Sequence, residues 1–238
     1  MIKANHSLKL TLIILLAVPG MAIAQSGPSP DENGPGLKKR VEAWIDGQDR
    51  AMSGSYSGVV FEEEAFDDIY DDEYYPMIRL GSYWYPVENL YLGVLVGGMY
   101  ETGETVGALT SARSGLDAEL TVIPVQVDLG YKFDFWDKQI LVPYVWGGYD
   151  WWYFEEDLEE ADDTEGDKNG WHWGAGVGIL LDPMDKPAAA TMKRWWGVDD
   201  TYLVLAYEEA RVGEDEDGID FSGVMYSAGL RFELRGGE

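Results

Sequence analysis

His172 is the main candidate for acid–base chemistry. The sequence contains only two histidines. The other, His6, lies in a segment that we expect to be cleaved off. Hydrolysis of a lipid ester would require a nucleophile, a base and an orienting acid within reach of one another. The serines nearest to His172 in the sequence are far away. We therefore predict that the protein is not an enzyme, with a lipid A or phospholipid hydrolase as the alternative.

Acidic side chains form the second group with chemical capacity. The chain has 44 Asp and Glu but only 17 Lys and Arg, so its formal net charge is −27. Carboxylate oxygens suit Ca²⁺ and Mg²⁺, and Asp215, Asp217 and Asp220 are weak candidates for a metal site. Their spacing is not that of an EF-hand, so we predict neither a discrete metal site nor a cofactor. Divalent cations held by the acidic loops remain an alternative.

The composition narrows the class of protein further. The negative charge excludes the basic surface that tracks the phosphates of nucleic acid. The absence of cysteine excludes disulfides and Cys-ligated zinc. The 10 Trp and 15 Tyr distinguish the chain from acidic disordered proteins, which are poor in aromatic residues.

The beginning of the chain has the pattern of a secretory signal peptide. Lys3 and Lys9 precede an apolar run over residues 10–18, and Ala22 and Ala24 are the small residues expected before a cleavage site. The run is shorter than the roughly 20 residues of a spanning helix, so a membrane anchor is the weaker alternative. We predict a signal peptide over residues 1–24, followed by a flexible leader and a short amphipathic helix over residues 25–50.

The rest of the chain, residues 51–235, is predicted to form eight strands. Apolar residues alternate with polar or small ones, as in Val224, Tyr226 and Ala228 against Met225 and Ser227. Several segments exceed the usual strand length of about 5–6 residues and match the roughly 9–11 of a tilted transmembrane strand. The expected strands are 51–61, 74–85, 90–101, 119–133, 139–153, 169–181, 200–210 and 221–235.

The connections favour a membrane barrel over a soluble all-β domain. Long acidic connections such as Glu62–Glu73 alternate with short ones such as Pro86–Asn89 and Asp134–Lys138. Outer-membrane barrels have long loops outside and short periplasmic turns, with aromatic residues at both interfaces. We predict an all-β fold, an eight-stranded antiparallel transmembrane β-barrel in the outer membrane of a Gram-negative bacterium.

The connection over residues 182–199 breaks this alternation, and we predict a short periplasmic helix between strands six and seven. Pro187 suits a first turn and Gly197 suits a C-cap. Two placements are open: the helix lies in the membrane interface, or it plugs the barrel mouth. Its apolar stripe is formed by Ala188, Met192, Trp195 and Trp196.

The interior of an eight-stranded barrel is just wide enough to be filled by side chains. Opposite charges there should pair, because an unpaired buried charge is costly. We predict a structural or surface-interaction role with a lumen filled by side chains and salt bridges; a narrow ion or small-solute channel is the alternative. The strand pattern places Arg79, Gln126, Asp128, Lys132, Asp150, His172, Arg231 and Glu233 inside.

Two stretches carry a resemblance to a known family, residues 141–148 and residues 170–185, together with the helix that follows and Thr201–Leu203. They are similar to a family of bacterial outer-membrane β-barrel proteins first delineated in myxobacteria, and the similarity spans roughly residues 55–235. The resemblance implies a small eight-stranded barrel with no assigned activity. Many outer-membrane barrels end on an aromatic residue, whereas here Phe232 is followed by six more residues. As partners we expect outer-membrane lipids and lipopolysaccharide, and we expect a monomer.

Overall fold

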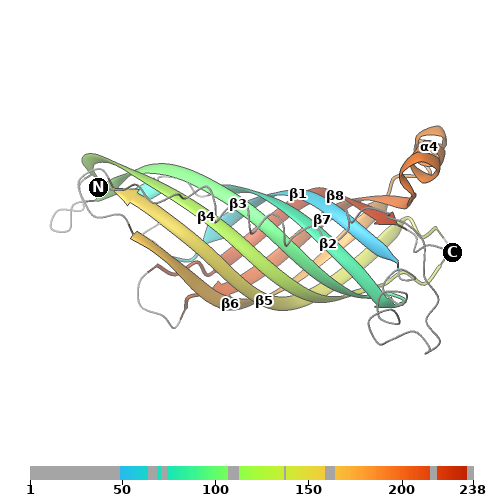
Figure 1. Cartoon of the computed structure of the whole chain (residues 1–238), viewed down its shortest axis with the longest axis horizontal. Coiled ribbons are helices and arrows are strands. Elements are labelled where there is room, and N and C mark those ends of the chain that lie inside the picture. Colours follow the sequence, from blue (N-terminus) through green and yellow to red (C-terminus); the bar gives the residue numbers. More distant parts are fainter. Residues whose placement is uncertain are drawn as a thin grey trace, which may run out of the picture.

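Eight strands close into one antiparallel barrel, in which each strand pairs with the next and β8 pairs with β1 (Figure 1). This confirms the predicted fold. The computed structural model describes residues 49–63, 69–70, 74–106, 113–136, 138–158, 164–214 and 219–234. The predicted signal peptide and nearly all of the leader therefore lie outside the described residues. The strands are β1 (Arg50–Phe61), β2 (Tyr75–Val87), β3 (Leu90–Val106), β4 (Arg113–Lys132), β5 (Leu141–Leu158), β6 (Thr164–Leu180), β7 (Val198–Val212) and β8 (Gly223–Leu234).

The two ends of the barrel differ in the length of the strands. At the end where β1 stops and β2 starts, β3, β4, β5 and β6 run well beyond the bounds predicted from the sequence, and β7 runs slightly beyond. We call this the long-loop end and the opposite one the short-turn end. Strands β3 to β6 continue there into polar sequence, where Glu119 pairs with Asp157 and Glu155 pairs with Glu165. The outward face of these extensions is polar, and the inward face adds only a few apolar side chains such as Ala118 and Phe154, so the alternation in the sequence is weak there.

Side chains alternate between the inside and the outside of the wall. Along β2, Met77 and Arg79 are buried, whereas Ile78 and Leu80 are each 64% exposed. The outward face carries many such apolar side chains, among them Leu92, Val94, Val127, Leu129 and Leu205. An apolar band of this kind around a closed barrel fits a hydrocarbon surrounding.

The buried side chains form three layers along the barrel axis. The layer at the long-loop end is an apolar cluster with Phe61, Trp152, Phe154 and Phe221 among its members. The layer at the short-turn end is rich in tyrosine and includes Tyr83, Tyr85, Tyr91, Tyr144 and Tyr202. Polar side chains lie between the two clusters and form the candidate site described below.

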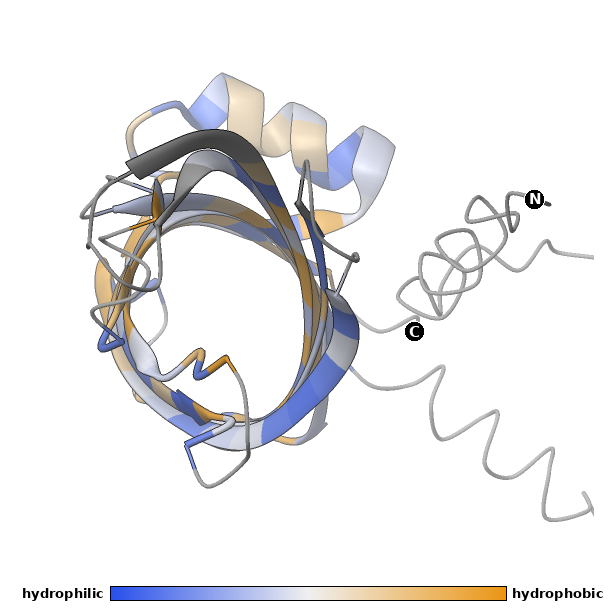
Figure 2. Cartoon of the chain, turned by 90° about the vertical axis from the view of Figure 1, so that its left-hand side faces the viewer, coloured by the Kyte–Doolittle hydropathy of each residue, from blue (hydrophilic) through white to orange (hydrophobic). Residues whose placement is uncertain are grey.

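Helix α4 (Lys186–Trp196) joins β6 to β7, which confirms the predicted helix. The side chain of Asp185 accepts a hydrogen bond from the backbone N–H of Ala188 at 3.0 Å, and Gly197 ends the helix with φ of 68°. Viewed along the barrel, α4 lies outside the ring of strands, so it does not plug the mouth (Figure 2). Among the described residues, no helix is long and apolar enough to cross a membrane.

A methyl group added at Gly130 should destabilise the barrel. An ideal Cβ there would lie 2.2 Å from Cζ of Tyr91. The Tyr91 ring packs against the rings of Tyr83 and Tyr85, with centroids 5.4 and 5.9 Å away. We expect Gly130→Ala to lower the free energy of unfolding by about 1–3 kcal/mol, the usual cost of overpacking, in urea titrations of refolded protein. Gly98→Ala is the control, because a Cβ at Gly98 meets nothing within 4 Å; equal stability of both variants would contradict this packing.

Candidate functional site

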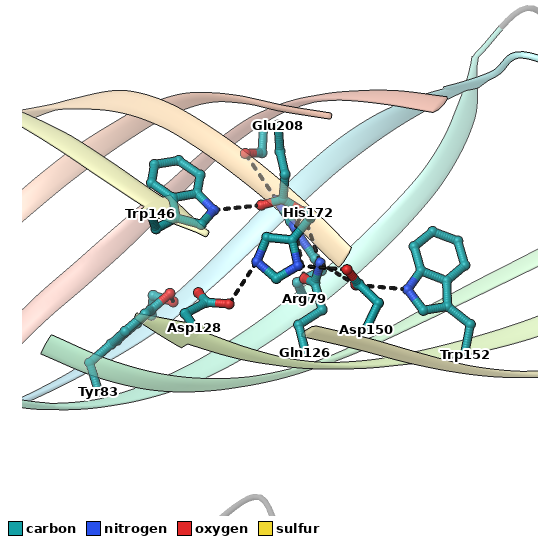
Figure 3. Close-up of polar contacts among 11 residues, drawn as sticks. Arg79, Tyr83, Gln126, Asp128, Trp146, Asp150, Trp152, His172 and Glu208 are labelled. Carbon is teal, nitrogen blue, oxygen red and sulfur yellow. Dashed lines mark hydrogen bonds and ion pairs between the residues drawn. The ribbon is translucent and has the colours of Figure 1, made fainter. Parts of the chain in front are cut away.

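His172 lies at the centre of the lumen, between two carboxylates. Its Nδ1 is 2.6 Å from an oxygen of Asp150, and its Nε2 is 2.9 Å from an oxygen of Asp128 (Figure 3). An imidazolium satisfies both carboxylates, because only the charged ring carries two N–H donors. Gly148 lies opposite His172 on β5, and a Cβ there would come within 2.8 Å of the imidazole. The glycine therefore makes room for the ring.

The ion pair of Arg79 with Glu208 forms the second half of this network. Nη1 of Arg79 donates to Oε1 of Glu208 at 2.9 Å, and both side chains are almost fully buried. The amide of Gln126 joins the two halves, because its Nε2 donates to Glu208 and to Asp150, each at 2.9 Å. The indole N–H of Trp146 donates to the second oxygen of Glu208 at 2.9 Å. Side chains from β2, β4, β5, β6 and β7 are thus held together.

A separate cluster forms at the short-turn end. Nζ of Lys132 lies 2.8 Å from Oε2 of Glu233 and 3.2 Å from a carboxylate oxygen of Asp134. The hydroxyl of Tyr85 donates to Glu233 at 3.0 Å. The eight residues that the sequence pattern places inside the barrel therefore fall into two groups. Lys132, Arg231 and Glu233 lie near the short turns, and the other five lie in mid-lumen, namely Arg79, Gln126, Asp128, Asp150 and His172.

Arg231 is stabilised by aromatic rings. Its guanidinium lies 4.0 Å from the ring centroid of Tyr83, 4.8 Å from that of Tyr91 and 4.9 Å from that of Tyr144. Its Nη2 donates to the hydroxyl of Tyr85 at 2.7 Å. Within the described part of the chain it forms no ion pair with a carboxylate, so the expected pairing of opposite charges is wrong for this residue. Buried cation–π contacts take the place of the ion pair.

A cavity of about 60 Å³ separates the mid-lumen network from the tyrosine layer. Arg79 and Glu208 line it on one side, and Tyr144 and Arg231 line it on the other. Both charged and apolar side chains line it, and it has room for a few water molecules. A solute larger than these could not occupy it without rearrangement of the network.

Glu208, Trp146 and Trp152 belong to the network but were not predicted from the sequence. The indole of Trp152 donates to Asp150 at 3.0 Å. Strand β7 alternates poorly, and the neighbouring Glu208 and Glu209 leave the inward face ambiguous. Glu208 is separated from the buried Tyr202 and Ala210 by even numbers of positions, so the three side chains share the inward face of β7. This spacing could have identified Glu208 from the sequence.

The candidate metal ligands form no visible cation site. Among the described residues, no group of three or more His, Asp or Glu side chains is placed to hold a metal ion. Asp220 accepts a hydrogen bond from the backbone N–H of Ser222 at 2.8 Å. Asp215 and Asp217 lie outside the described residues.

Residues 54–232 match the family described as the outer membrane protein beta-barrel domain. The match covers most of the chain, which therefore belongs to this family and is an outer-membrane β-barrel protein. In such proteins the long loops face the outside and the short turns face the periplasm. We accordingly refer to the long-loop end as extracellular and to the short-turn end as periplasmic.

Solved structures share the fold at low sequence identity. The outer membrane protein OprG from Pseudomonas aeruginosa is 13% identical, with a TM-score of 0.56 over 80% of this chain and 99% of that chain. Ail, the attachment invasion locus protein of Yersinia pestis, solved in complex with the heparin analogue sucrose octasulfate, is 12% identical, with a TM-score of 0.48 over 79% and 99%. No curated protein matches the sequence.

Removing the guanidinium of Arg79 leaves the charge of Glu208 without its ion-pair partner. We expect Arg79→Met to lower the free energy of unfolding by about 3–5 kcal/mol, the cost of breaking a buried pair. Glu208→Gln in the same chain should recover part of the loss. The free energy of unfolding is measured by urea titration in lipid vesicles for the wild type, both single variants and the double variant, which together form a double-mutant cycle. Strictly additive effects would show that the two side chains do not interact.

Proposed function

We propose that this protein is a closed barrel with a structural or surface-interaction role, and that it does not conduct ions. The observation that carries the proposal is the filling of the lumen by three successive layers of buried side chains. Eight strands enclose only enough space for side chains, so a filled interior leaves no continuous path.

The extracellular layer supports closure most directly. The ring centroid of Phe221 lies 5.7 Å from that of Trp152, 5.4 Å from that of Phe154 and 5.9 Å from that of Phe61. Tyr70 covers this cluster from the loop side and donates to Glu156 at 2.9 Å. Burial raises the pKa of the Tyr70 phenol, so it remains a donor. An apolar constriction of this kind opposes the entry of hydrated ions.

We also propose that the barrel has no lipid hydrolase activity. Both ring nitrogens of His172 are bound to carboxylates, so neither is available to take a proton from a hydroxyl nucleophile. The lumen location of His172, 2% exposed, also keeps it away from the lipid-facing surface.

Within its family, we propose that the protein belongs to the group first delineated in myxobacteria, because residues 141–148 and 170–185 are similar to that group.

The outward face of the extracellular extension is the proposed interaction surface. Glu119 lies directly opposite Asp157, and Glu155 lies opposite Glu165, on strands β4, β5 and β6. Like charges facing each other across strands repel. We propose that divalent cations relieve this repulsion and link the surface to the phosphates of lipopolysaccharide, and that the protein acts as a monomer.

Bilayer recordings test closure. Refolded protein, with insertion verified by heat-modifiable gel mobility, should give no current steps, because apolar and polar layers both block the lumen. A porin of 16 or more strands in the same bilayer serves as the positive control. Steady steps from the inserted barrel would favour the narrow channel instead.

Calorimetry with Mg²⁺ tests the acidic surface. Wild-type protein should bind Mg²⁺ with a dissociation constant of about a millimolar or tighter. The variant Glu119→Gln/Glu155→Gln/Asp157→Asn/Glu165→Gln should bind more weakly. Glu88→Gln, which removes an exposed acid at a periplasmic turn, should leave binding unchanged. Absence of binding heat from the wild type refutes the cation bridge.

A further inference from the structure

Helix α4 differs in charge from the rest of the chain. Lys186, Lys193 and Arg194 give it three positive charges, and it contains no acidic residue, whereas the whole chain carries −27. Lys193 pairs with Asp199 just beyond the helix. The helix itself is thus basic, although Asp182, Asp185 and Asp199 flank it, and Lys186 and Arg194 are the cations left for an outside partner.

The apolar face of α4 is uncovered. Trp195 and Trp196 are 72% and 73% exposed, and the helix buries none of its residues. Indole rings of this exposure beside a membrane barrel are typical of the headgroup level, where their apolar body and polar N–H are both accommodated.

Helix α4 lies beside the barrel wall and not across the barrel mouth (Figure 2). The helix lies outside the ring of strands at the periplasmic end (Figures 1 and 2). The chain leading to it is bonded to the barrel edge, since the N–H of Leu180 donates to the carbonyl of Ile140 at 2.8 Å. At the same edge, Phe135, Trp136 and Ile140 are 61%, 68% and 57% exposed. Exposed aromatic side chains therefore lie both on α4 and on the turn between β4 and β5 at this end.

We propose that α4 is an interfacial helix that binds anionic phospholipid in the periplasmic leaflet of the outer membrane. Trp195 and Trp196 lie among the headgroups, and Lys186 and Arg194 contact their phosphates. Basic side chains near an anionic leaflet are attracted to it over a Debye length. The other anionic lipid, lipopolysaccharide, occupies the opposite leaflet. The barrel would then be oriented by its acidic surface outside and its basic helix inside.

The absence of cysteine from the sequence allows α4 to be labelled at single sites. Ala188 and Ala190 are both exposed, and two helical positions turn the chain by about 200°, so they lie on opposite faces. Variants Ala188→Cys and Ala190→Cys, each with an environment-sensitive fluorophore, are refolded into phosphatidylcholine vesicles with and without phosphatidylglycerol. Brominated lipid and aqueous iodide serve as the two quenchers.

The Ala188→Cys label, on the face of the tryptophans, should be quenched by brominated lipid, and the Ala190→Cys label by iodide. The lipid quenching should be at least twofold stronger with phosphatidylglycerol, weaken with added salt, and weaken in Lys186→Gln/Arg194→Gln. Heat-modifiable mobility verifies that each variant is folded. Equal iodide quenching of both labels would overturn the proposal and leave α4 as a contact for a periplasmic protein. Lipid quenching that ignores phosphatidylglycerol would overturn the role of anionic lipid.

Discussion

The narrow lumen is the constraint on which the rest of the structure depends. Eight strands enclose a space that side chains must fill, and a charge placed there must find a partner because it has lost its water. The imidazole of His172 between Asp150 and Asp128 meets this requirement in mid-lumen. Gly148 is needed for the same arrangement, because a side chain at this position would collide with the imidazole ring of His172.

The layers on either side solve the same problem in different ways. The extracellular layer excludes water with packed aromatic rings, whereas the periplasmic layer contains two buried cationic side chains. There, Arg231 rests among tyrosine rings, and Lys132 pairs with Glu233. Outside the lumen the charge is divided by side, with carboxylates beyond the extracellular interface and the basic helix α4 at the periplasmic one. Helix α4 is therefore a short basic segment in a chain whose overall charge is negative.

The strands were predictable because period-two alternation survives wherever one face meets lipid and the other meets the lumen, as along β4 and β8. It weakens where the outward face is polar and few apolar residues remain on the inward face, so the extracellular ends of β3 to β6 were missed. Inward residues on clearly alternating strands, such as Asp128 and His172, were identified. The contacts between them were not predicted, because contacts depend on the register of all eight strands. Glu208 was missed because it lies on β7, one of the strands that alternate less cleanly.

Closure of the lumen requires that the polar network centred on His172 be interlocked and shielded from water by the layers on either side. Nitrogen-15 NMR of histidine-labelled protein, refolded in lipid without the predicted signal peptide, tests it directly, because His172 is then the sole histidine. An interlocked network should give one imidazole ring with two ring-nitrogen signals, whose N–H protons exchange slowly with water and show contacts to Asp128 and Asp150. Rapidly exchanging ring protons, as in a water-filled pore, would contradict it.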